Sequence, residues 1–406
     1  MTLLALCAAS FVPRRNAASG EGGDELYADD AARRRAISYN RQREWLTVIG
    51  MAWGVLVNLV ALTTGLSSWL RRRSAAVAPA RLGATIPYAL ASSLLSSLAS
   101  LPLAYYSGWT VEQRYGLSNQ TRRAWFGEQL KGEGLGLALG LPLIQGVYAV
   151  IRRYPRTWWA ILSSLMVPFT IILSNLAPIL IMPLFNKYEP IRDRALADRI
   201  KALAAAQGVT ISEVLQMDMS KQTKKANAMF TGIGNTKRIV LADTLLNEFT
   251  PEEVEIVLAH ELGHQVHRDI WKLIGLGALT TALTAWAVDR LAAPLFARYG
   301  RRFGFDQTQG LADVAALPLL SLLLSAISLL LSPVQNAISR NLIERPADRY
   351  ALDLTKNPDA FVSAMEKLGR LNLADPRPPH LVKWLLYSHP PLQERIAFGH
   401  AWREKA

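Results

Sequence analysis

The sequence predicts a mainly α-helical protein that crosses a membrane several times and carries a smaller polar part outside the bilayer. Half of the 406 residues are apolar, and 45 Lys and Arg against 32 Asp and Glu give a formal net charge of +13. The apolar residues are concentrated in six runs without a charge, and the single cysteine, Cys7, rules out an intrachain disulfide framework. The runs cover residues 45–70, 82–111, 134–151, 157–186, 273–288 and 314–339.

Four of these runs are long enough to cross the hydrocarbon core of a bilayer, which takes about 20 helical residues. They are apolar around the whole helix, whereas helices on the surface of soluble proteins are apolar on one side only. The runs at 134–151 and 273–288 are short enough to be buried soluble helices on length alone, but they lie beside longer runs and have basic flanks. We therefore expect six spans.

Residues 1–12 form a further, shorter apolar stretch, followed by Pro13, Arg14 and Arg15. A secretory signal carries its basic residues before the apolar stretch rather than after it. We expect a disordered or interfacial tail here, with a truncated seventh span as the alternative.

The remaining polar residues divide the chain into five parts. The two larger polar stretches, residues 187–269 and 340–406, are each too short for a large core of their own, so we expect them to pack together. In the first of them, periodicity predicts a helix at 193–208, a strand at 214–219 and a hairpin of strands 227–230 and 238–241. The parts are a polar N-terminal tail (1–44), four transmembrane helices (45–186), a soluble part (187–269), two transmembrane helices (270–339) and a C-terminal part of the soluble domain (340–406).

Basic residues flank the spans on both sides, so the positive-inside rule separates the two sides of the membrane weakly. Summed over alternate loops, with seven Arg in residues 1–44, the rule favours the cytoplasm for the polar parts. The net charge thus has a membrane explanation, and no nucleic-acid-binding pattern is present.

A metal-binding pattern lies in the first polar part. Thr250 and Pro251 have the order of a helix start, and the helix reaches His260-Glu261-Leu262-Gly263-His264. Residues four apart share a helix face, so His260 and His264 can bind one metal ion, while Glu261 lies about 100° round the helix. Catalytic zinc uses three protein ligands and leaves one position open, so we expect one Zn²⁺ per chain. The alternative is a hydrogen-bonded histidine pair without metal.

Two other zinc protease classes do not fit. The metzincin pattern needs Gly at position 267 and His at position 270, where this chain has His267 and Ile270. Intramembrane metalloproteases place the motif inside a span, but Glu255 and Arg268 flank it here. We expect the motif helix at the membrane edge, with a structural or solvated role for His267.

The third ligand must come from elsewhere in the chain. Glu344 and Asp348 are four residues apart and share a helix face, so Glu344 can bind the metal while Asp348 accepts the second N–H of a histidine ligand. On spacing alone, an exposed ion-pair face with Arg340, Arg345 and Arg349 is the more ordinary reading.

Several stretches in this order resemble the type I CAAX prenyl proteases, a family of integral membrane zinc metalloendopeptidases. The resemblance runs from about residue 45 to residue 400 and rests on six blocks, each of modest weight alone. The blocks are 111–112 with 115–121, 183–188, 227–230 with 237–241, 260–264, 344 with 347–348, and 388–391 with 394–396.

The resemblance implies a zinc ion bound by His260, His264 and Glu344, with Glu261 as general base and acid. It implies a zincin-like α+β protease domain at the cytosolic end of six to seven spans that surround a chamber. It further implies that Asn227 and Ala228 contact an extended peptide substrate at a sheet edge, that His389 helps to stabilise the oxyanion and that Arg395 supports it.

Two features depart from the family pattern. The family has seven spans where this sequence shows six, and Pro346 follows Glu344 by two residues, where a kink could turn the ligand away. The expected function is zinc-dependent peptide hydrolysis, of a prenylated protein C-terminus or of damaged membrane proteins in general. A non-catalytic membrane scaffold is the alternative from another class; a transporter is disfavoured because few ionisable residues lie in the apolar runs.

Overall fold

The computed structural model describes residues 26–405 except 28, 79–80 and 233–236. The apolar stretch at 1–12 lies outside these residues, and so does most of the turn between the strands of the predicted hairpin. The predicted tail at 1–44 lies partly within them, and its described end is helical, because α2 already begins at Asp30.

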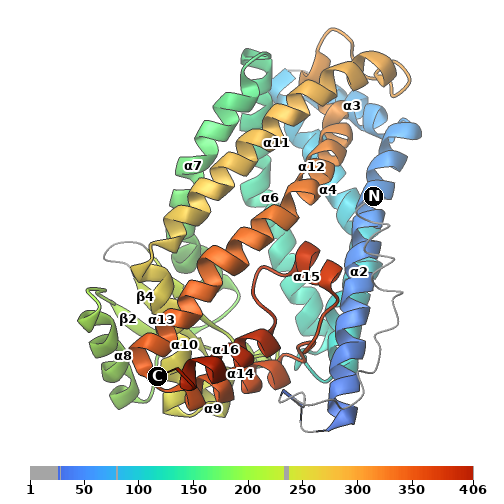
Figure 1. Cartoon of the computed structure of the whole chain (residues 1–406). Coiled ribbons are helices and arrows are strands. Elements are labelled where there is room, and N and C mark those ends of the chain that lie inside the picture. Colours follow the sequence, from blue (N-terminus) through green and yellow to red (C-terminus); the bar gives the residue numbers. More distant parts are fainter. Residues whose placement is uncertain (1–25, 28, 79–80, 233–236, 406) are drawn as a thin grey trace.

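Six helical segments of the described chain are long and apolar enough to cross a membrane, which confirms the six predicted spans. They run side by side between the two ends of the molecule (Figure 1). The two short apolar runs belong to full-length helices of 32 and 31 residues, because the charged residues beside each run continue the same helix. The main helices are α2 (Asp30–Thr63), α4 (Arg81–Tyr105), α6 (Arg122–Arg153), α7 (Trp158–Leu176), α11 (Asp269–Tyr299) and α12 (Leu317–Ile338).

Helix α6 carries an acidic residue immediately before the apolar run 134–151. Glu133 belongs to α6 and accepts hydrogen bonds from Ser97 (2.9 Å) and Ser93 (3.4 Å) of α4. The two hydroxyls satisfy the carboxylate locally, in agreement with a contact between helices.

Shorter elements complete the bundle. α3 (Leu66–Val77) packs on α4. α4 continues through a π-helical turn, η1 (Tyr106–Thr110), into α5 (Val111–Arg114), and α7 continues through η2 (Ala177–Ile181) and η3 (Met182–Leu184) towards the polar end.

A four-stranded sheet lies at that polar end. Its strand order is β1-β2-β4-β3, with β2 and β4 parallel and the other pairs antiparallel. The predicted strands and the hairpin are confirmed, whereas the short edge strand β1 was not predicted. The strands are β1 (Tyr188–Pro190), β2 (Glu213–Met217), β3 (Ala228–Thr231) and β4 (Arg238–Ala242).

Helices from both polar stretches pack around this sheet in one hydrophobic core. Leu258 and Leu262 come from the first stretch and Leu352, Phe361 and Ile396 from the second, and each is 2% exposed or less. These helices are α8 (Arg194–Ala206), α9 (Asp243–Glu248), α10 (Pro251–Val266), α13 (Arg345–Thr355), α14 (Pro358–Leu371) and α16 (Leu392–Arg403). The remaining helix, α15 (His380–Leu386), packs on the spans α2 and α12 instead.

Candidate active site

Helix α10 holds the two histidines of the motif and begins after Thr250, as predicted, and side chains fix this start. The Thr250 hydroxyl accepts from the Glu253 N–H, and the Glu253 carboxylate accepts from the Thr250 N–H (2.8 Å). Glu253 also accepts from Lys367 (2.7 Å) and Ser363 (2.5 Å) of α14. Burial alone would raise the pKa of Glu253, but these partners lower it below its ordinary value. The start of the helix is thereby tied to the second polar stretch.

The structure brings the three proposed ligands together. Nε2 of His260 lies 3.2 Å from Nε2 of His264 and 3.4 Å from Oε2 of Glu344, and the second histidine is 3.9 Å from the same oxygen. His260 and Glu344 are 7% and 6% exposed, and one ligand atom from each of the three residues lies within 4.8 Å of the others. Three donors therefore converge on one small volume.

Glu344 reaches this position through an irregular helix. α12 ends in a π-helical turn, η8 (Ser339–Glu344), and α13 begins at the next residue. Pro346 is the second residue of α13 and follows this π-helical turn directly. The backbone departs from α-geometry before Pro346, as the sequence suggested, but Glu344 still points at the histidines.

Close packing of α10 against α13 sets the distance between the ligands. A Cβ on Gly263 would lie 3.2 Å from the Cα of Ala347 and equally close to the Tyr350 ring. Because one of these neighbours is backbone, a larger residue at Gly263 would push the two helices apart. The glycine inside the motif thus fixes how near α10 comes to the segment that carries Glu344.

Each histidine also has a carboxylate at its other ring nitrogen. Oδ1 of Asp348 lies 2.9 Å from Nδ1 of His260, as expected from the sequence, and Oδ2 of Asp269 lies 2.9 Å from Nδ1 of His264. Asp269 was not predicted; its signal was an acidic residue five positions after His264, at the first position of α11. Such carboxylates orient histidine ligands and raise their basicity.

The two carboxylates differ in their own partners. Arg395 donates from Nε to both oxygens of Asp348 (2.9 and 3.1 Å). His260, Asp348 and Arg395 are all buried. Lys272 donates to Asp269 (2.6 Å) from an exposed position. Burial disfavours the charged form of His260, but the carboxylates of Asp348 and Glu344 outweigh it and raise its pKa to about 9.

The donor set fits a zinc ion. Oε2 of Glu344 is buried and makes no hydrogen bond, although imidazole nitrogens face it on several sides. Two imidazoles with carboxylate-bound Nδ1 atoms and one carboxylate form a His₂Glu set, which is a known ligand combination of catalytic zinc. A cation among these three side chains would satisfy the isolated oxygen.

A cavity of about 360 Å³ opens beside this cluster and contains the other proposed site residues. Glu261, Asn227, Ala228, His389 and Arg395 all line it together with His260. Asn227 and Ala228 lie at the start of β3, which is an edge strand of the sheet. A second strand can therefore pair along β3 without displacing a neighbour.

His389 reaches the metal cluster from the segment before α16. Its Nε2 lies 3.2 Å from Oε2 of Glu344, and its side chain is more than half exposed. His267 does not join the cluster, because its ring packs against Tyr350 with centroids 5.5 Å apart. Six of the proposed site residues line this cavity, and His264, Glu344 and Asp348 contact His260 from outside the lining.

Comparisons with known proteins agree with this arrangement. Residues 25–187 match the family described as CAAX prenyl protease N-terminal, five membrane helices, and residues 190–402 match Peptidase family M48. The chain is 33% identical to an uncharacterized metalloprotease, YhfN, of Bacillus subtilis, over 91% of this chain and 85% of that protein. It is 30% identical to CAAX prenyl protease 1 of Saccharomyces cerevisiae, over 92% and 86% of the two chains.

A solved structure is similar over almost the whole length. The crystal structure of S. mikatae Ste24p superposes with a TM-score of 0.85 at 25% identity and covers 98% of this chain and 97% of that one. The helical bundle, the small sheet and the position of the motif helix therefore belong to a known architecture. The chain is an integral multi-pass membrane metalloprotease and belongs to peptidase family M48.

Proposed function

We propose that this protein is a zinc-dependent endopeptidase of the CAAX prenyl protease type. The observation that carries the proposal is the convergence of His260, His264 and Glu344 on one point, with Glu261 in the adjoining cavity. Residues 187–269 and 340–406 act as one catalytic unit, because both contribute to a single hydrophobic core and to the donor set. The basic flanks favour the cytoplasmic side of the membrane for this unit.

His260, His264 and Glu344 would hold the zinc ion, which supplies Lewis acidity for the scissile carbonyl and lowers the pKa of water. Glu261 follows His260 on the same helix and lines the cavity, so its carboxylate takes the proton of the attacking water and delivers it to the leaving amine. His389 lies at the cavity edge and donates to the oxygen that gains charge. Arg395 holds Asp348, which in turn orients His260.

The substrate is an extended peptide that pairs with the edge strand β3. Asn227 and Ala228 face the cavity at the start of that strand, so a peptide added there passes the donor set. We propose a prenylated protein C-terminus as the substrate, on the strength of the relatives named CAAX prenyl protease 1. Clearance of damaged membrane proteins is the other substrate class that these parts suit.

Glu261→Gln tests the mechanism. The purified variant should retain zinc by metal analysis and lose peptide cleavage, because the amide cannot accept the proton of water. Glu255→Gln is the matched control, since Glu255 lies on the same helix and pairs with Arg199 on the surface. Near-normal turnover by Glu261→Gln would refute the assignment.

A pair of peptides tests the substrate. A farnesylated peptide and its unprenylated twin, given to the wild-type protein at equal concentrations, should be cleaved at clearly different rates. Equal rates would remove the prenyl substrate and favour general clearance, while leaving the Glu261 result untouched.

A further inference from the structure

A second, larger cavity lies at the end of the helix bundle opposite the proposed zinc site. Its volume is about 840 Å³. α11 connects the two places: it begins at Asp269, beside His264, and reaches the cavity at Asp289. At 1.5 Å per residue these two positions are about 30 Å apart, roughly the thickness of a bilayer core.

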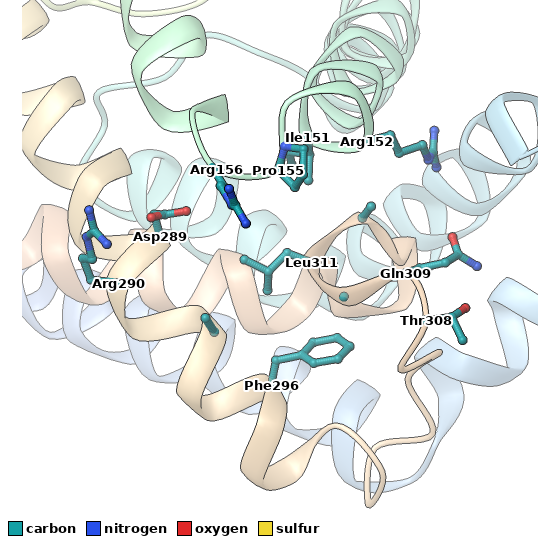
Figure 2. A pocket seen from close by; sticks show the side chains of 13 residues that line it. Ile151, Arg152, Pro155, Arg156, Asp289, Arg290, Phe296, Thr308, Gln309 and Leu311 are labelled. Atoms are coloured by element: carbon teal, nitrogen blue, oxygen red, sulfur yellow. The ribbon is translucent and has the colours of Figure 1, made fainter.

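Three segments form the walls of this cavity. They are the end of α6 with the turn into α7, the last third of α11 and the turn around η6 (Gly310–Ala312). Figure 2 shows Arg156 reaching from the α6–α7 turn into the space, with Asp289 and Arg290 on one side and Leu311 and Phe296 beneath. The cavity thus has a charged upper part and an apolar floor.

The charged part has an excess of positive charge. Asp289, the single acidic lining residue, already accepts a hydrogen bond from the indole of Trp158 (2.8 Å). Arg152 is anchored to Thr85 (2.8 Å) and lies over the Tyr148 ring. Within the part of the chain that the structure describes, Arg156 and Arg290 have no hydrogen-bond or ion-pair partner. Two guanidinium groups are therefore available to a ligand.

The surroundings place this cavity at a membrane surface. Tyr154 and Trp159 flank the α6–α7 turn, and such aromatic residues are enriched where a bilayer meets water. The apolar lining includes Ile151 from α6 and Phe296 from α11, which are 3% and 7% exposed. A small soluble anion would contact the arginines but would leave the apolar side chains of the cavity exposed to water.

We propose that this cavity binds the phosphate headgroup of an anionic phospholipid. Arg156 and Arg290 bind the phosphate oxygens, because the planar guanidinium matches phosphate with paired hydrogen bonds. The glycerol region of the lipid rests on Phe296 and Leu311. The volume of the cavity is within the usual range of ligand sites. The site is independent of the peptidase chemistry.

Lipid titration of the purified full-length protein in detergent tests the proposal. Native mass spectrometry would compare phosphatidylglycerol, phosphatidylcholine with the same acyl chains, and inorganic phosphate. The wild-type protein should bind phosphatidylglycerol most tightly. The Arg156→Gln/Arg290→Gln variant should bind it about 30-fold more weakly, because each basic side chain near an anionic lipid surface contributes about a fivefold factor.

The matched control is Arg153→Gln/Arg301→Gln, which removes the same charge from the same end of the bundle without altering the cavity lining. It should bind phosphatidylglycerol as the wild type does. Equal weakening in both variants, no preference for phosphatidylglycerol over phosphatidylcholine, or equally tight binding of inorganic phosphate would each overturn the proposal. The thermal midpoint of the cavity variant, unchanged from wild type, shows that the loss is not unfolding.

Discussion

The two segments that carry the metal-binding side chains differ in regularity. α10 is a regular helix with a capping box, and it presents His260 and His264 through the ordinary spacing of a helix. The segment with Glu344 passes through a π-helical turn and a proline before it becomes α13. A regular helix can fix two ligands from local sequence alone, whereas the third ligand depends on how a distant, irregular segment packs against it. The following changes separate these two contributions.

The largest effect is expected where the irregular segment loses its ligand. Glu344→Ala should abolish both zinc binding and cleavage, because two histidines alone leave the donor set incomplete. Metal analysis and peptide cleavage would measure this. Glu366→Gln, which removes a surface carboxylate of α14, is the control. Full zinc content in Glu344→Ala would show that α10 binds the metal without α13.

A smaller effect is expected from the carboxylates behind the histidines. Asp348→Asn and Asp269→Asn should each lower zinc affinity by about 10- to 100-fold, because both orient a histidine ring. Asp348→Asn should have the greater effect, since its removal also leaves the buried Arg395 without its partner. Competition with a chelator would give the affinities. Unchanged affinity in both variants would reduce these residues to a structural role.

Spacing between the two helices can be changed without touching a ligand. Gly263→Ala should destabilise the fold by about 1 to 3 kcal/mol, the usual cost of overpacking, and should lower zinc affinity as α13 moves away. Gly275→Ala in α11 is the matched control, because a Cβ there meets nothing within 4 Å. Thermal unfolding with and without a chelator would test both. If Gly263→Ala is as stable as the wild type, α10 and α13 have enough space for a Cβ at this position.

The smallest expected effect concerns the start of α10. Glu253 has a lowered pKa in the folded protein, so its ionised form stabilises the fold above the ordinary pKa of 4.5, and this contribution disappears as the pH falls through the folded-state value. Glu253→Gln should cost about 1 to 2 kcal/mol at pH 7.

The difference in thermal midpoint between Glu253→Gln and wild type should therefore shrink from pH 7 to pH 4. Glu252→Gln, in the same turn but exposed, should change the midpoint little at either pH. A difference that does not depend on pH would show that the carboxylate charge of Glu253 does not stabilise the helix.

Much of the architecture could be predicted because its signals are local. Apolar runs predicted the six spans, and alternating residues predicted β2 and the β3–β4 hairpin. The errors lie where an element extends beyond its own signal. The apolar run 134–151 begins after Glu133, although α6 already starts at Arg122, and β1 is too short to show a pattern.

The sequence by itself determined the histidine pair, since residues four apart share a helix face whatever surrounds them. Only the tertiary structure decided which carboxylates reach these histidines. Glu344 lies about 80 residues further along the chain than the histidines. Asp269 contacts His264 from the first position of the next helix, α11. The same holds at the other end of the bundle, where Arg156 and Arg290 share one cavity. The spacing of residues in the sequence determines which side chains are neighbours on one helix. The packing of the helices determines which side chains on different helices become neighbours.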